Sequence, residues 1–377
     1  MRLFRLALAA LASLALSASL VATPAAAQGN GFYSGKSATT GVQFKSYSFG
    51  DGAEFEKATQ FAIPFAIVVP VSQRFSVDMG TFYAITSATT ATGGARSVSG
   101  LTDVQLRGSY MLGRDAAVLS LLVNLPTGTK FSSDDALTAG AAASNFLLFP
   151  VNSYANGFSV TAGVGVAKRI GEWGIGLAGS ARMSAEYQPF SGAADTTYAP
   201  GFEGRIRLGA DRNVGQGRVR FGLTYSTYGD DTFGAGSGAD TKYSPGGRFI
   251  AEGAYSWPGL GGTVSAYAWN YYRKTGATDS VSVSNSENIL AAGLSARRPI
   301  NPNTTFEPGI EGRFWSYNGG AGGGKVVGLV AGLRHRLNDR VSVVPNIRAE
   351  FGTLDLVGGS SASLTGLGAS VFLRYSF

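Results

Sequence analysis

His and Cys, two of the residues most often used for catalysis and metal binding, are scarce in this chain. The 377 residues include one His, His335, and no Cys, which excludes cysteine nucleophiles, thiolate metal sites and any site that needs two imidazoles. His335 lies among alternating apolar residues, without the Ser or carboxylate company that barrel hydrolases require. The sequence therefore predicts that the protein is not an enzyme and holds neither a metal nor an organic cofactor.

The other residues with functional potential are charged residues that alternate with apolar ones. Around position 205, for example, Glu203, Arg205 and Arg207 alternate with Ile206 and Leu208. A period of two places one set on each face of a β-strand. Residues placed in this way, which we expect to line one shared face, are Arg107, Arg182, Arg205, Arg207, Arg220, Arg248, Arg313, Glu203, Glu252 and Glu311.

The same alternation predicts the strands that carry these residues. Short turns and long polar loops follow one another between the strands, and no later stretch has the ~18 consecutive apolar residues of a membrane helix. We expect sixteen strands, with fourteen as the alternative because the first strand and the Gly-rich 262–273 strand are weak. The predicted spans are 41–49, 57–70, 75–86, 100–112, 116–125, 157–170, 173–187, 200–212, 218–228, 247–257, 262–273, 286–297, 304–317, 325–337, 341–352 and 362–377.

Segment length and composition favour a membrane barrel over a soluble sandwich. Charged residues make up 15% of the chain, against about 25% in ordinary soluble domains. The segments exceed the usual ~5–6 residues of a soluble strand and match the ~9–11 residues of a membrane strand that is apolar outside and polar inside. The sequence therefore predicts an all-β, transmembrane, antiparallel up-and-down barrel formed by residues 28–377.

Both ends of the chain carry export signals. Arg2 and Arg5 precede an apolar run at 6–22 and the small residues 25–27, which is typical of a signal peptide that ends at residue 27. Alternating apolar residues lead to Tyr375 and Phe377, and this ending resembles the insertion signal of bacterial outer-membrane barrels. We expect the barrel-assembly machinery to read this strand. The protein would then lie in the outer membrane of a Gram-negative bacterium, with both termini in the periplasm.

Aromatic residues are predicted to form two girdles where the barrel meets the membrane surfaces. One set lies near the tight turns and the other near the long loops. The first comprises Tyr110, Trp173, Trp257, Tyr375 and Phe377, and the second comprises Tyr83, Tyr187, Tyr225, Tyr271 and Trp315.

A barrel of sixteen strands leaves an aqueous interior that something must fill, narrow or use. The charged inner face favours ion pairs between strands, while its Arg excess would also suit a path for anions. The connection 126–156 is the longest and least polar, and Phe146, Leu148 and Phe149 are its candidates for a constriction folded into the lumen. The alternative is that this loop packs on the rim or on lipopolysaccharide.

Two motifs resemble those of a known family. The segment Ser99-Gly100-Leu101-Thr102-Asp103-Val104 looks like a Gly-Leu-Gly-Asp-Val strand entry, with Thr102 at the second Gly, and Asn124-Leu125-Pro126-Thr127-Gly128 looks like the matching strand exit. Both are found in outer-membrane transporters of the phenol meta-degradation pathway type, which are distantly like hydrocarbon and fatty-acid channels. The resemblance implies passive uptake of small hydrophobic or aromatic compounds.

Two other functions remain open from the residues alone: a diffusive porin with anion preference, and a plugged structural or adhesive barrel. The expected partners are membrane lipid, lipopolysaccharide and a small-molecule solute. A formal net charge of +7, dispersed along the chain, does not indicate a nucleic-acid partner.

Overall fold

The computed structural model describes residues 36–113, 117–132, 146–191, 196–235, 240–278, 281–318, 322–356 and 359–377. Every regular element within these ranges is a β-strand. No helix of the described residues is long and apolar enough to cross a membrane. The signal peptide predicted for residues 1–27 lies outside the described residues and stays a prediction.

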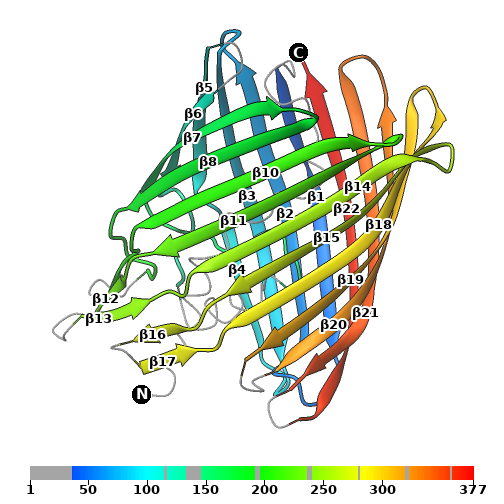
Figure 1. Ribbon diagram of the computed structural model, residues 1–377. Helices are drawn as coiled ribbons and strands as arrows, with labels where there is room; N and C mark the ends of the chain where they lie inside the picture. Colours follow the sequence, from blue (N-terminus) through cyan, green and yellow to red (C-terminus); the bar gives the residue numbers. More distant parts are fainter. Residues whose placement is uncertain are drawn as a thin grey trace.

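Seventeen strand segments form one closed antiparallel sheet (Figure 1). β4 and β5 share one position, because both pair with β3, so the barrel has sixteen strand positions. The segments are β1 (Ser37–Phe49), β2 (Phe55–Pro70), β3 (Phe75–Thr90), β4 (Ala95–Leu101), β5 (Val104–Leu112), β6 (Ala117–Leu125), β7 (Ser159–Ile170), β8 (Trp173–Ser184), β10 (Glu203–Val214), β11 (Gly217–Tyr228), β14 (Arg248–Gly259), β15 (Gly262–Arg273), β18 (Glu287–Asn301), β19 (Thr304–Tyr317), β20 (Gly323–Arg336), β21 (Val341–Asp355) and β22 (Ser361–Ser376).

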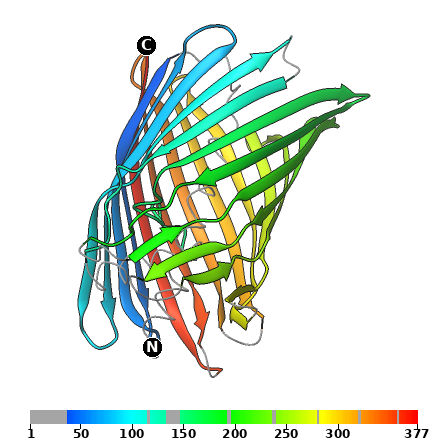
Figure 2. The ribbon, with the colours of Figure 1, turned by 90° about the vertical axis from the view of Figure 1, so that its left-hand side faces the viewer.

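The barrel closes where its first and last strands pair. β1 and β22 run antiparallel, with Ser37 opposite Ser376 and Phe49 opposite Leu364. Each of the sixteen predicted spans overlaps one strand position, so the sixteen-strand prediction is confirmed and the fourteen-strand alternative is wrong. Both views show the strands inclined to the long axis of the barrel (Figure 1 and Figure 2), as closure of a sheet requires.

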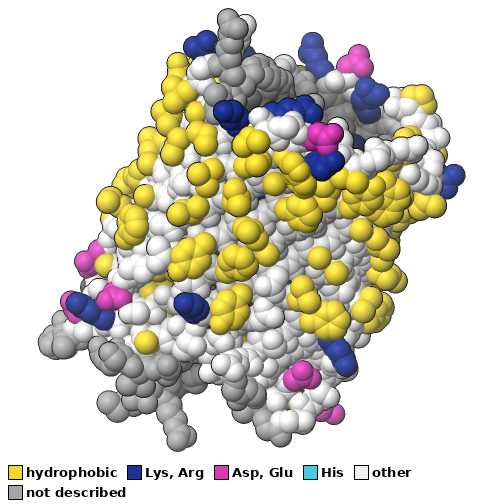
Figure 3. Space-filling model, viewed as in Figure 1, with side chains coloured by type: hydrophobic (Ala, Val, Ile, Leu, Met, Phe, Trp, Pro, Cys, Tyr) yellow, Lys and Arg dark blue, Asp and Glu magenta, His cyan; other side chains and the backbone are white. Residues whose placement is uncertain are grey.

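The outer face of the barrel is apolar. Large side chains at alternate positions of each strand point outward and are exposed, among them Leu121 on β6, Phe221 on β11 and Ile347 on β21. In Figure 3 hydrophobic side chains are spread over the visible outer face among other side chains and backbone, and most charged ones lie toward its two ends. An apolar surface this continuous far exceeds the few hundred Å² that soluble monomers expose. It is the exterior of a membrane-spanning barrel, in which every backbone group pairs within the sheet.

A second, five-stranded sheet continues part of the wall beyond the long-loop ends of β8 to β18 (Figure 1). This rim sheet consists of β9 (Thr196–Ala199), β12 (Asp231–Ala235), β13 (Thr241–Ser244), β16 (Gly276–Thr278) and β17 (Val281–Ser284). It was not predicted from the sequence. Gly and Pro separate its strands from the barrel strands: a Cβ on Gly201 would collide with the carbonyl of Gly229, and one on Gly246 with that of Lys274. Such close backbone approaches break a strand at these points.

The described ends of the chain meet at the tight-turn end of the barrel. The Phe377 amide donates to the Lys36 carbonyl at 3.0 Å. Tyr375 and Phe377 are exposed on the outer face, with ring centroids 5.5 Å apart. The roles of Tyr375 and Phe377 as an insertion signal, and of this end as the periplasmic one, stay predictions.

The predicted girdle near the long loops is wrong at three positions. Tyr271 is buried inside the barrel, and Trp315 and Tyr187 pack against buried interior residues. The outward residues at this level include Phe202, Tyr225, Phe249 and Tyr272. Neighbouring residues of a strand point to opposite faces. Because Tyr271 and Tyr272 are both aromatic, the sequence pattern did not show which of them faces outward.

Candidate functional site

The inner face of the barrel carries the predicted charged residues. They alternate with the exposed apolar residues of β5, β8, β10, β11, β14 and β19 and therefore point into the lumen. This placement holds for Arg107, Arg182, Arg205, Arg207, Arg220, Arg248, Arg313, Glu203, Glu252 and Glu311. Glu186, which we also expected on a strand, lies beyond the end of β8.

Most of these arginines contact carboxylates. Arg107 contacts Asp78 of β3 at 2.9 Å. Arg205 contacts Glu203 at 2.5 Å, and Arg182 lies 4.0 Å from the same carboxylate. Arg207 of β10 reaches across β11 to Glu252 of β14, a path that Gly222 leaves open because a Cβ there would collide with the Glu252 carboxylate. These pairs brace the inner wall, both within β10 and between strands.

A buried charge cluster joins four strands deeper in the lumen. Its centre is Glu350 of β21, which contacts Arg313 of β19, Arg348 at 3.0 Å and Lys45 of β1 at 3.4 Å. The side chains of Arg313 and Glu350 are each 1% exposed. Glu311 of β19 extends the cluster: it contacts Arg348 at 2.7 Å and accepts from the Tyr267 hydroxyl of β15, the fourth strand, at 3.0 Å.

Lys45 and the neighbouring Tyr47 were missed from the sequence. The predicted first strand covered both residues, but nothing local indicated that they would meet Glu350, which lies 303 residues from Tyr47 along the chain.

Residues 146–156, here called the lumen segment, lie inside the barrel. Phe146 stacks on Trp315 with ring centroids 5.1 Å apart, and Phe149 packs edge-on against Tyr47 at 5.4 Å. Both are buried, whereas Leu148 is half-buried. The apolar cluster around them draws on the inner faces of several strands, namely through Tyr271 of β15, Ile289 of β18, Val326 of β20 and Leu364 of β22.

Hydrogen bonds from the wall hold the lumen segment. Lys45 Nζ donates to the Leu148 carbonyl at 3.1 Å, and the Tyr47 hydroxyl donates to the Leu147 carbonyl. Gln60 of β2 makes two bonds with Val151, from its Nε2 to the carbonyl at 2.7 Å and from the Val151 amide to its Oε1 at 2.8 Å. Leu148 has a φ of 53°, a strained conformation for Leu that only such surrounding contacts maintain.

The rim sheet covers the far part of the lumen segment. Tyr154 and Val151 are buried in one apolar cluster with Tyr198, Phe233 and Tyr243 of β9, β12 and β13. The Tyr154 hydroxyl lies 2.6 Å from Thr86 Oγ1, and burial raises the pKa of Tyr154 to about 12. The lumen segment is therefore enclosed between the rim sheet and the barrel wall.

One carboxylate fixes both ends of the connection that contains the lumen segment. Asp103 Oδ1 accepts from the Gly128 amide at 2.7 Å. Its Oδ2 accepts from the Asn156 amide at 2.6 Å and from Asn124 Nδ2 at 2.8 Å. The two sequence motifs noted above, one containing Asp103 and the other Asn124 and Gly128, thus form a single junction between β4, β5 and β6.

Replacing Asp103 with Ala is expected to loosen the lumen segment. The change leaves buried amide donors without an acceptor, at a cost of ~1–3 kcal/mol for each unsatisfied group. Hydrogen exchange of amides in 146–156 should accelerate strongly. The control is Asp78→Ala, which removes a carboxylate from the exposed pair with Arg107 and should leave exchange in 146–156 unchanged. Equal exchange in the two variants would contradict the clamp.

Asp231 in the rim sheet is buried. Its Oδ2 accepts from the Tyr198 hydroxyl and its Oδ1 from the Gly201 amide, both at 2.7 Å. Burial nevertheless raises the pKa of the Asp231 carboxyl.

The raised pKa makes the rim sheet sensitive to pH. The protonated acid is favoured in the fold, so this contribution to stability is complete below the ordinary Asp pKa of ~3.9 and is lost as pH rises through the higher folded-state value. We expect the protection factors of amides in β9 and β12, which correct for the intrinsic pH dependence of exchange, to rise on mild acidification. Asp231→Asn should flatten this dependence, whereas Asp240→Asn should retain it. A pH profile identical in wild type and Asp231→Asn would contradict the assignment.

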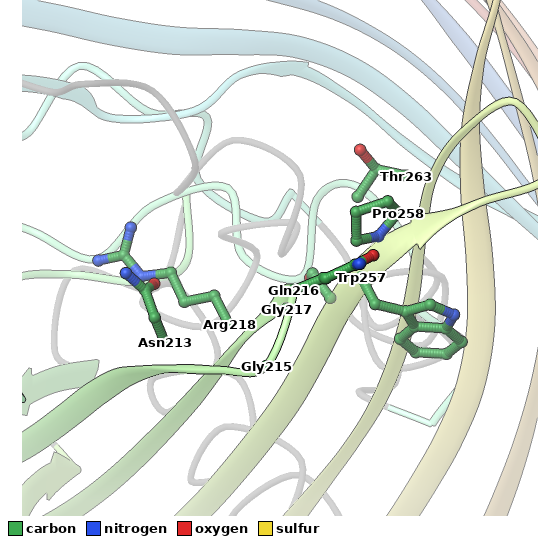
Figure 4. Close-up of a pocket in the computed structure, with 9 residues that line it drawn as sticks. Asn213, Gly215, Gln216, Gly217, Arg218, Trp257, Pro258 and Thr263 are labelled. Atoms are coloured by element: carbon green, nitrogen blue, oxygen red, sulfur yellow. The ribbon is translucent and has the colours of Figure 1, made fainter.

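A hollow of about 400 Å³ lies on the inner wall beside the tight turn between β10 and β11. Figure 4 shows Asn213 and Arg218 on one side of it and Pro258 and Thr263 on the other. Arg218 contacts Asp211 at 2.6 Å. The hollow therefore belongs to the paired, polar wall of the lumen.

His335 lies on the outer face of β20 near the tight-turn end, with Nδ1 2.9 Å from Thr304 Oγ1. Within the described ranges, no group of three or more His, Cys, Asp or Glu residues could hold a metal ion. Because it points outward, His335 lies apart from the charged residues of the lumen.

Comparisons with known proteins give structural similarity alone. No family model matches the chain, and no curated protein matches it. It is similar to a loop-deletion mutant of OmpT, an outer membrane protein of Vibrio cholerae, with 11% identity, 89% of this chain and 98% of that chain covered, and a TM-score of 0.42. It is also similar to a mutant of the TodX monoaromatic hydrocarbon channel, with 11% identity, 91% of each chain covered and a TM-score of 0.46. A third similar structure is the anion-selective porin from Comamonas acidovorans, with 12% identity, 91% of this chain and 98% of that chain covered, and a TM-score of 0.39.

Proposed function

We propose that this chain is an outer-membrane channel for the passive uptake of small hydrophobic or aromatic compounds. The apolar exterior supports a place in the membrane, with the tight-turn end in the periplasm and the rim sheet toward lipopolysaccharide. Insertion through the strand that ends in Tyr375 and Phe377 is part of the same proposal. The two motifs that resemble those of phenol meta-degradation transporters agree with this solute class.

The observation that carries the proposal is the aromatic filling of the lumen. Phe146 lies against Trp315, and Phe149 against Tyr47. An aromatic solute can replace Phe146 on the face of Trp315, since stacked aromatic pairs contribute ~0.5–1.5 kcal/mol beyond the area they bury. A purely diffusive porin needs an open aqueous path, and an apolar segment across that path would obstruct it. Phe146, Leu148 and Phe149 are accordingly proposed as the constriction.

Uptake of a radiolabelled neutral aromatic compound by intact cells tests this function. Cells that lack the gene should take up benzyl alcohol more slowly than complemented cells at low external concentration. Trp315→Ala should change the rate, whereas Phe314→Ala, which alters the adjacent outward side chain with 57% exposure, should not. Equal uptake with and without the gene would refute the proposal.

A diffusive porin with anion preference is the second candidate. It is favoured by inward arginines, such as Arg220, that have no carboxylate contact among the described residues. Reversal potentials in planar bilayers under a KCl gradient distinguish it: chloride selectivity for small ions supports this candidate, and no selectivity removes it.

A further inference from the structure

We infer that the preferred solutes are aromatic carboxylates, recognised below the lumen segment by a row formed by Arg336, Ser342 and Arg374. This inference rests on the proposed function and names its substrate class. The row lies on β20, β21 and β22 near the tight-turn end. The aromatic contacts Phe146–Trp315 and Phe149–Tyr47, here called the aromatic layer, offer a surface that can bind a ring. The row, further toward the tight-turn end, offers a surface that can bind a carboxylate.

The sheet register places the three residues side by side. Arg336 pairs with Ser342, and Ser342 pairs with Arg374. Strands lie ~4.7–4.9 Å apart, so the two arginines are separated by about two strand spacings with a hydroxyl between them. All three alternate with outward residues, such as Leu333 and Leu373, and therefore face the lumen.

The guanidinium groups of the row lack carboxylate partners among the described residues. Arg336 donates to the Pro302 carbonyl at 3.1 Å, and the side chain of Arg374 has no hydrogen bond or ion pair within the described ranges. Both are exposed. The two like charges repel each other across Ser342, and an anion between them would offset this repulsion. A carboxylate in that position would accept hydrogen bonds from both guanidiniums, the strong charge-assisted type.

The neighbouring charges strengthen the positive character of this wall. Arg334 of β20 and Arg297 of β18 both contact Glu307, at 3.4 and 3.5 Å. On the opposite side the arginines of β5 and β10 contact the carboxylates described above. Positive charge therefore also gathers at β18 to β22, and a low-dielectric wall with an excess of one charge can raise the local concentration of an anion by ~10–10³-fold.

The aromatic part of the solute is defined by the layer above. The buried charge cluster around Glu350 lies on the same strands as the row, because Arg348 and Glu350 belong to β21 together with Ser342. A ring that leaves the Trp315 face toward the tight-turn end thus meets the row along β20 to β22. Neutral aromatic compounds use only the first of these two surfaces, and aliphatic carboxylates use only the second.

Paired ions of one shape test the inference. In planar bilayers, reversal potentials would be measured under gradients of sodium benzoate and of benzylammonium chloride, which carry the same ring with opposite charges. Benzoate should be preferred over benzylammonium, and over acetate. The benzoate preference should fall as ionic strength rises from ~0.01 to ~1 M, because the Debye length shortens from ~30 to ~3 Å.

Variants locate the preference in the row. Arg336→Gln/Arg374→Gln should lower the ratio of benzoate to benzylammonium permeability on the order of tenfold. Ser342→Asp, which retains both arginines and adds a carboxylate between them, should lower it as well and guards against misfolding of the double variant. Arg212→Gln, on the outer face beside Glu172, is the matched control and should not change the ratio.

Each outcome decides a different statement. Equal permeation of benzoate and benzylammonium, or a ratio unchanged in both row variants, would overturn the inference while benzyl alcohol uptake by cells still upheld the proposed function. If the gene makes no difference to benzyl alcohol uptake and the bilayers pass no aromatic ion, the proposed function and the inference both fail. A benzoate preference lost in both row variants supports the inference.

Discussion

Deletion of Phe146–Pro150 is expected to give the largest functional change, a several-fold rise in single-channel conductance. The deletion removes the aromatic contacts with Trp315 and Tyr47 and the carbonyls that bind Lys45 and Tyr47. A barrel of sixteen strands without internal filling leaves an aqueous channel. Planar-bilayer recordings of the purified protein measure the change directly.

Point variants separate the filling from general damage to the barrel. Phe146→Ala should raise conductance less than the deletion, because the backbone of the lumen segment remains in place. Phe314→Ala, which trims an exposed outward side chain of β19, should leave conductance unaltered. If the deletion folded and conducted like the wild type, residues 146–150 would not limit the path.

Glu350→Gln is expected to give the largest loss of stability. The substitution leaves Arg313 and Lys45 buried without their shared carboxylate, and removing one partner of a buried ion pair costs ~3–5 kcal/mol. Unfolding by urea in detergent micelles, followed by the heat-dependent gel mobility typical of folded barrels, measures the difference.

The matched control is Glu172→Gln, which removes the carboxylate of the Arg212 pair. Glu172 is 71% exposed, and surface pairs of this kind contribute ~0–1 kcal/mol. The expectation is a clear loss for Glu350→Gln and almost none for the control. Comparable losses in the two variants would show that the inner cluster does not stabilise the barrel.

The barrel was predictable from the sequence because lipid imposes a period of two on every strand. Burying a charged residue such as Arg207 against hydrocarbon costs ~2–4 kcal/mol at the midplane, so its register is strongly determined. The same rule gives no answer where adjacent positions are both aromatic, as at Tyr271 and Tyr272. There the face depends on cross-strand partners that the local sequence does not identify.

The contacts that hold the lumen segment were beyond sequence reasoning for a different reason. Tyr47 and Glu350 lie 303 residues apart, and Gln60 and Val151 lie 91 apart. Such pairs depend on the closure of the whole barrel. The apolar character of 146–150 indicated a buried position, but only the three-dimensional arrangement shows that Asp103 joins the two ends of the connection.

The interruption of the wall on one side only has a mechanical consequence. β1 to β3 and β19 to β22 run without a break, whereas the extensions of β10, β11, β14, β15 and β18 are separate strands of the rim sheet. Continuous backbone pairing makes a sheet stiff, so the unbroken side of the wall resists bending. The Gly and Pro breaks on the other side act as hinges. Thermal fluctuations at the long-loop end of the barrel will therefore be asymmetric: the rim sheet will move more than the unbroken strands β1 to β3 and β19 to β22.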